Sequence, residues 1–120
     1  LGWGAASFPV LYLIKQGIYD AQHTHNLFLE LSINFGIVTA LIFLGFLSAI
    51  LITSYKSIFL EKSDNKIINR AWFTSAFILL ITHLNDITYF DLRISITFWI
   101  ILSGLRCIIF ENSIIRKKLP

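Results

Sequence analysis

The stretch that decides the fold runs from Leu31 to Ser54 and reads LSINFGIVTALIFLGFLSAILITS, without a single charged residue. A helix over it would be about 36 Å long at about 1.5 Å per residue, which exceeds the roughly 30 Å hydrocarbon core of a bilayer. A helix of this length on a soluble protein is expected to carry a charged face. The stretch therefore predicts a transmembrane helix, which we place at 27–54.

The composition of the 120-residue chain agrees with a membrane protein. Hydrophobic residues make up 56% and charged residues 14%, whereas a soluble domain usually carries about 25% charged residues. The mean hydropathy is +0.73. A single cysteine, Cys107, excludes a disulfide-stapled module. Because the chain begins at Leu1 and contains no Met, we expect a C-terminal fragment, preceded by further transmembrane helices of the same chain.

Two more apolar runs follow the first span. They are Ala71–Asn85 and Ile94–Phe110. One unbroken helix over both would place Asp86, Asp91 and Arg93 in the middle of the membrane, where charges are costly. We therefore predict a transmembrane helical hairpin over 71–110 with a turn at 86–93. The predicted fold class is all-α, a polytopic membrane protein with about three transmembrane helices, the last two forming a short hairpin.

Lysine and arginine are distributed unevenly between the loops. The basic residues of the 55–70 loop and of the C-terminal end are Lys56, Lys62, Lys66, Arg70, Arg106, Arg116, Lys117 and Lys118. The segment before the first span contains only Lys15. Because cytoplasmic loops are enriched in Lys and Arg, we expect 55–70 and 111–120 in the cytoplasm. The segment 1–26, with a short interfacial helix, and the turn 86–93 are then external. Topology accounts for the net charge of +3, so no nucleic-acid partner is predicted.

Polar residues gather at the external mouth of the first span. On a helix, Asn26, Glu30 and Asn34 recur at i, i+4 and i+8 and form one polar stripe. Such a stripe is costly against lipid, so it must face other helices or a wet cavity. Helix packing, substrate contact and the lining of a transport pathway are all compatible with this pattern.

His23 and His25 stand at the same mouth. An imidazole can act as a general base near neutral pH, but a histidine in an exposed loop can equally be a solvated residue. Residues two apart lie on opposite sides of a strand or about 200° apart on a helix, which is a poor arrangement for joint metal ligation. No Cys or third His follows at ligand spacing, so we expect no metal site and no cofactor.

One motif in this region resembles a known family. The residues His25-Asn26, nine further residues and Gly36-Ile37-Val38-Thr39 resemble the H-[NSQ]-x9-G-x-x-[GTY] motif of the O-antigen ligase and O-antigen polymerase superfamily. Upstream, Gly2-Trp3-Gly4-Ala5-Ala6-Ser7-Phe8 is similar to the G-x-G-x-x-x-F stretch that begins the same external loop in that family. A later segment, HLNDITYFDLR, is similar only to a subset, some of which are regarded as bicarbonate transporters.

The resemblance implies a multi-pass glycosyltransferase of the inner membrane whose site faces the periplasm. Its donor would be a glycan on undecaprenyl diphosphate, and its acceptor a hydroxyl of lipid A core or of another glycan. His25 would be the general base, with no metal ion required. Candidate substrate-binding residues are Asn26, Glu30, His23 and Arg93.

Two of these assignments keep an alternative. Arg93 is a candidate contact for the donor diphosphate, because cationic groups stabilise the leaving charge, but pairing with Asp86 or Asp91 is the structural alternative. His83, inside the second span, is expected to be a hydrogen-bonded packing residue. For the chain as a whole, the alternatives are a transporter of bicarbonate or another small solute and a structural subunit.

Overall fold

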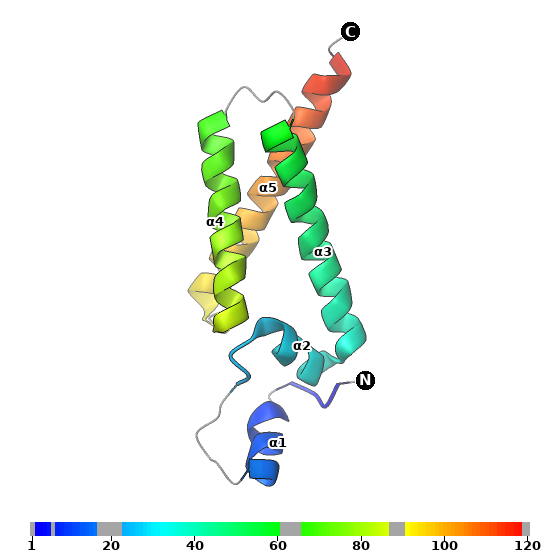
Figure 1. Ribbon diagram of the computed structural model, residues 1–120, viewed down its shortest axis with the longest axis vertical. Coiled ribbons are helices and arrows are strands. Elements are labelled where there is room, and N and C mark those ends of the chain that lie inside the picture. The colour runs from blue at the N-terminus through cyan, green and yellow to red at the C-terminus, as the bar shows by residue number, and fades with distance from the viewer. Residues whose placement is uncertain (1, 6, 17–22, 61–65, 87–90, 119–120) are drawn as a thin grey trace.

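The computed structural model describes residues 2–5, 7–16, 23–60, 66–86 and 91–118, and these residues form helices and no strand (Figure 1). The elements are α1 (Ser7–Gln16), α2 (Leu27–Phe35), α3 (Ile37–Tyr55), the π-helical turn η1 (Lys56–Leu60), α4 (Lys66–Asn85) and α5 (Leu92–Lys118). The predicted all-α class is therefore confirmed.

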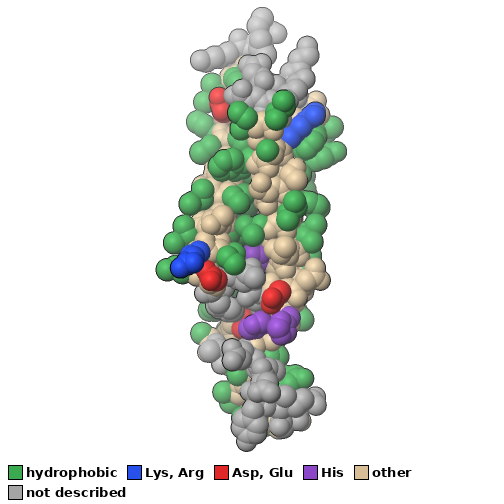
Figure 2. Space-filling model, turned by 90° about the vertical axis from the view of Figure 1, so that its left-hand side faces the viewer, with side chains coloured by type: hydrophobic (Ala, Val, Ile, Leu, Met, Phe, Trp, Pro, Cys, Tyr) green, Lys and Arg blue, Asp and Glu red, His purple; other side chains and the backbone are tan. Residues whose placement is uncertain are grey.

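Three helical segments are long and apolar enough to cross a membrane. They are Ile37–Leu60, Ile67–Asn85 and Leu92–Ile115. In an 18-residue apolar window of each segment, only 17% of the residues are buried inside the structure, so most of this apolar surface faces outward. Figure 2 shows hydrophobic side chains along the middle of one face, with charged side chains above and below them. The chain is therefore a multi-pass membrane protein.

The predicted hairpin is formed by α4 and α5, which pack against each other and against α3. Both helices continue beyond the uncharged runs into flanking basic residues, and they are about 30 Å and 40 Å long. Their contact is close where Gly104 of α5 lies against the indole of Trp72, whose Nε1 donates a hydrogen bond to the carbonyl of Ile101 at 2.8 Å. The buried side chains between the three helices are Leu47, Phe98 and Leu102 in one cluster and Ile58, Ala76 and Leu105 in another.

The helix expected at 27–54 is divided at Gly36, which corrects the prediction of one continuous span. Gly36 has φ 93° and ψ 155°, a backbone conformation that is essentially restricted to glycine. The chain therefore turns between α2 and α3, and α2 lies across the lower ends of α3 and α4 (Figure 1). The membrane-spanning segment begins only at Ile37.

The break leaves backbone carbonyls at the end of α2 without partners in the same helix, and the N-terminal segment supplies some of the missing donors. The N–H of Trp3 donates to the carbonyl of Ile33 at 2.7 Å, and that of Gly4 donates to the carbonyl of Asn34 at 3.1 Å. A Cβ at Gly2 would lie 2.5 Å from backbone atoms of Asn34. Glycine is therefore required there, because the two backbones are in direct contact.

The described segments gather at two opposite ends of the molecule. α1, α2, the C-terminal end of α4 and the N-terminal end of α5 lie at one end, and η1 and the C-terminal end of α5 lie at the other (Figure 1). The turn residues 87–90 and the loop residues 61–65 lie outside the described residues, as do 17–22. α5 continues through most of the predicted tail, 111–120. Which end is cytoplasmic stays a prediction.

Candidate functional site

The N-terminus of α2 holds the first residue of the site in place. Asn26 is the N-cap of α2, and its Oδ1 accepts a hydrogen bond from the N–H of Leu29 at 3.2 Å. The amide nitrogen of the same side chain donates to the carbonyl of Leu84 in α4 at 2.9 Å. One side chain thus begins α2 and fixes that beginning to the end of α4.

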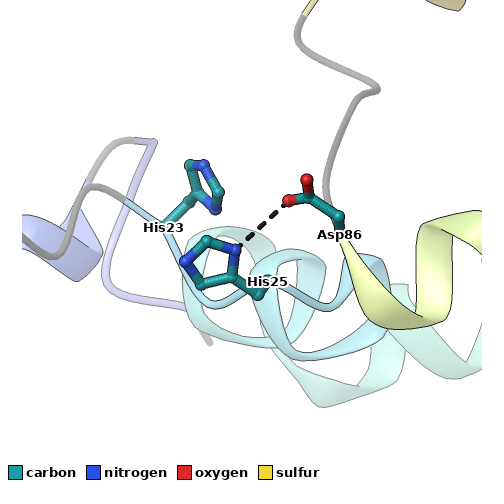
Figure 3. A group of neighbouring side chains, drawn as sticks. All are labelled: His23, His25 and Asp86. Carbon is teal, nitrogen blue, oxygen red and sulfur yellow. Dashed lines mark hydrogen bonds and ion pairs between the residues drawn. The ribbon is translucent and has the colours of Figure 1, made fainter.

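His25 and Asp86 meet at this junction, although they are 61 positions apart in the sequence. Nδ1 of His25 lies 3.2 Å from Oδ1 of Asp86, and the two side chains are 67% and 60% exposed. Asp86 directly follows α4, and its N–H donates to the carbonyl of Thr82 at 2.9 Å. The contact between Asn26 and Leu84 therefore holds the end of α4 near His25. Figure 3 shows the resulting pairing of the imidazole with the carboxylate.

His23 also belongs to this cluster, which corrects our expectation that the two histidines point apart. The ring centroids of His23 and His25 are 4.3 Å apart, at an interplanar angle of 63°. The reason is the backbone of His25, whose φ of 53° is left-handed, so the loop is neither a strand nor a helix at this point. His23, His25 and Asp86 each offer one ligand atom, and these atoms lie within 4.8 Å of one another (Figure 3).

Glu30 holds in place the loop that carries His23 and His25. Its side chain is buried, with 3% exposed, and Oε2 accepts a hydrogen bond from the N–H of Thr24 at 3.2 Å. Oε1 accepts a hydrogen bond from Nδ2 of Asn34 at 2.9 Å. Because Thr24 lies between the two histidines, the Glu30 carboxylate fixes the backbone that presents both rings. Glu30 and Asn34 thus hold the loop on α2, and the polar stripe has a structural role.

The remaining candidates lie elsewhere. Arg93 is exposed in the first turn of α5, where its backbone N–H, rather than its guanidinium, donates to Oδ1 of Asp91 at 2.8 Å. His83 is 1% exposed and packs against the ring of Phe98, with Nδ1 2.6 Å from the carbonyl oxygen of Leu79. His83 therefore has the packing role predicted for it.

The pairing of His25 with Asp86 has a chemical consequence. When Nδ1 carries the proton and donates it to the carboxylate, Nε2 is left with a free lone pair. A carboxylate on one ring nitrogen orients the imidazole and stabilises the cation that forms when the other nitrogen takes a proton. From the sequence, Asp86 was expected at the turn and as a possible partner of Arg93, and its contact with His25 was missed. Its place at the end of an apolar run, on the same predicted side as His25, was the available signal.

The chain matches no protein-family model, curated protein or solved structure. The geometry of this site and the resemblance of the motif around His25 are therefore the two observations that bear on function.

Proposed function

We propose that this chain belongs to a membrane glycosyltransferase of the O-antigen ligase type, acting in the synthesis of cell-surface polysaccharide or lipopolysaccharide. The enzyme would move a glycan from undecaprenyl diphosphate to an acceptor hydroxyl of lipid A core or another glycan, with its site on the periplasmic face of the inner membrane. The observation that carries the proposal is the contact between His25 and Asp86 at the end of a membrane span.

In the proposed reaction, Nε2 of His25 takes the proton of the acceptor hydroxyl. The hydroxyl oxygen attacks the anomeric carbon of the donor glycan, and the bond between that carbon and the diphosphate oxygen breaks. The electron pair leaves with undecaprenyl diphosphate. Asp86 stabilises the imidazolium that forms on His25. A general base of this kind accelerates a reaction by about 10²–10⁴-fold.

An apolar groove beside the site supports the proposal that the donor is linked to a lipid, because the groove could bind an isoprenoid chain. The groove lies between α2, α3 and α4 and is lined by Leu27, Phe43, Leu47, Leu80 and Leu84, among others. Leu27 follows the capping residue of α2, and the carbonyl of Leu84 accepts the hydrogen bond from that cap. An isoprenoid chain in the groove would therefore place its diphosphate beside His25 and Asp86. Arg93, which lies in the first turn of α5 and outside this cluster, stays the candidate cation for the leaving diphosphate.

The test is glycan transfer by full-length protein reconstituted with a labelled undecaprenyl diphosphate glycan and its acceptor. We expect His25→Ala to abolish transfer and Asp86→Asn to lower the rate, while membrane insertion is unchanged. Asp91→Asn is the matched control, because it removes a carboxylate at the same end and an Asn can still cap α5. Transfer at the wild-type rate by His25→Ala would refute the proposal.

The hydrogen bonds of the polar stripe do not support the alternative function, a small-solute transporter. In the polar stripe that could line a pathway, Asn34 donates to Glu30 and Asn26 donates to the carbonyl of Leu84. Among the described residues, only Oδ1 of Asn34 lacks a partner in this stripe.

A further inference from the structure

We propose that His23, His25 and Asp86 bind a divalent transition-metal ion of the zinc class. The site shares His25 and Asp86 with the proposed general base, but metal binding there does not depend on glycan transfer. The three side chains come from two segments of the chain, the loop before α2 and the end of α4, which Asn26 joins through its hydrogen bond to Leu84. Figure 3 shows the two rings next to each other, with the His25 ring joined to the Asp86 carboxylate.

The distances fit a small ion with little movement. Tetrahedral zinc sites have bonds of about 2.0–2.2 Å, which place neighbouring ligand atoms about 3.4 Å apart. The pair formed by Nδ1 of His25 and Oδ1 of Asp86 is already at 3.2 Å. The three ligand atoms lie within 4.8 Å of one another, so His23 needs to approach by at most about 1.5 Å. Rotation of its side chain can supply that movement.

The loop holds the ligands together before any ion binds. A left-handed backbone is uncommon for residues other than glycine, and His25 has φ 53°. That conformation turns both rings to one side, and the buried carboxylate of Glu30 fixes Thr24 between them. In addition, Nδ1 of His23 is buried and has no hydrogen-bond partner among the described residues. A buried ring nitrogen without a partner is unfavourable, and a metal ion would satisfy it.

The chemistry of the ligands selects the class of ion. Imidazole nitrogen suits zinc, copper, nickel and iron, whereas magnesium and calcium prefer sites built from oxygen alone. Two imidazoles and one carboxylate leave the fourth tetrahedral position open, as in zinc sites with three protein ligands. The 67% and 60% exposure of His25 and Asp86 gives an ion direct access from solvent.

One consequence rests on the proposed function. An ion on Nδ1 of His25 leaves the proton on Nε2, so the metal-bound ring has no lone pair with which to take a proton from an acceptor. Zinc loading should therefore suppress glycan transfer, and removal of zinc by EDTA should restore it. An unchanged transfer rate in zinc-loaded protein would count against His25 as the base, whereas the binding titration alone decides the metal site.

The titration uses full-length protein purified without a polyhistidine tag, stripped with EDTA and titrated with zinc chloride in a calorimeter. We expect one Zn²⁺ per chain in the wild type. His23→Ala and Asp86→Asn should each weaken zinc binding at least about tenfold. Even a residue that only supports a metal ligand weakens binding by about that factor when it is removed, so loss of a ligand itself should cost no less. Asp91→Asn should bind as the wild type does, and circular dichroism should show equal helix content in all four proteins.

Two results would overturn the proposal. One is the absence of stoichiometric zinc binding by the wild type. The other is a titration in which His23→Ala and Asp86→Asn, with wild-type helix content, bind zinc as tightly as the wild type. Competition by an equal concentration of magnesium chloride would overturn the assignment to the zinc class.

Discussion

The contact between Gly104 of α5 and Trp72 of α4 makes the packing of the hairpin testable with one methyl group. A Cβ at position 104 would lie 2.3–2.4 Å from Nε1, Cε2 and Cζ2 of the indole, far inside van der Waals contact. In a Gly104→Ala variant the indole must therefore move. It would then lose the 2.8 Å hydrogen bond from its Nε1 to the carbonyl of Ile101.

The expected loss of stability follows from three terms. Forcing an extra methyl group into a packed contact costs about 1–3 kcal/mol, and the lost hydrogen bond costs about 1 kcal/mol. Alanine is favoured over glycine inside a helix by about 0.5–1 kcal/mol, which offsets part of this cost. Gly104→Ala should therefore lower the free energy of unfolding by about 1–3 kcal/mol.

Gly45 provides the matched control, because a Cβ at this position of α3 would meet no atom within 4 Å. Gly45→Ala should be as stable as the wild type or up to about 1 kcal/mol more stable. The assay is denaturant unfolding in detergent micelles, followed by circular dichroism. In a double-mutant cycle, Trp72→Leu should relieve part of the loss, because the indole is then absent. A Gly104→Ala protein as stable as Gly45→Ala would refute the reasoning.

Two further predictions concern the ends of α2. Gly36→Ala should lower the free energy of unfolding by about 1–3 kcal/mol, because φ 93° is strained for alanine; wild-type stability in the same unfolding assay would contradict this. Asn26→Ala should cost about 1–2 kcal/mol through the lost cap, whereas Asn26→Asp should cost less, because it keeps the cap and loses only the donor to Leu84. Equal losses in the two variants would show that the cap contributes nothing.

The spans and the hairpin could be predicted from the sequence because a bilayer imposes a simple requirement. An apolar run long enough to cross the hydrocarbon core has few alternatives to a helix, and the acidic residues at 86 and 91 could only lie at its end. The same reasoning missed the break in the first span. Hydropathy reports the polarity of side chains, and Gly36 adds no charged or polar side chain to the apolar run, whereas the break depends on its backbone angles.

The site was predicted only in part, for a related reason. The motif identified His25, and the polar stripe identified Glu30, since both are local patterns. The rule that residues two apart point in different directions assumes regular backbone angles, and the left-handed conformation of His25 removes that assumption. Asp86 is 61 positions away, so its contact with His25 depends on the hydrogen bond between Asn26 and Leu84, which no local pattern contains.

The spacing of the motif itself has a structural meaning. Its nine intervening residues are those of α2, Leu27–Phe35. Asn26 caps the beginning of this helix, Gly36 ends it, and the hydroxyl of Thr39 donates to the carbonyl of Phe35 at 3.2 Å. The other three fixed positions of the motif, Asn26, Gly36 and Thr39, thus lie at the two ends of this helix. His25 has no such role in the helix, which is compatible with the general-base role proposed for it.

Because α2 has a fixed length between its cap, Asn26, and the break at Gly36, it sets both the position and the direction of His25, the residue that precedes it. One residue more in α2 would shift its N-terminus by about 1.5 Å and turn it by about 100° relative to α3. The 3.2 Å contact between His25 and Asp86 could not survive that rotation, because the carboxylate is fixed to the end of α4. The motif therefore specifies where His25 lies relative to the first span. Its glycine, which ends α2, helps to set the position of the site.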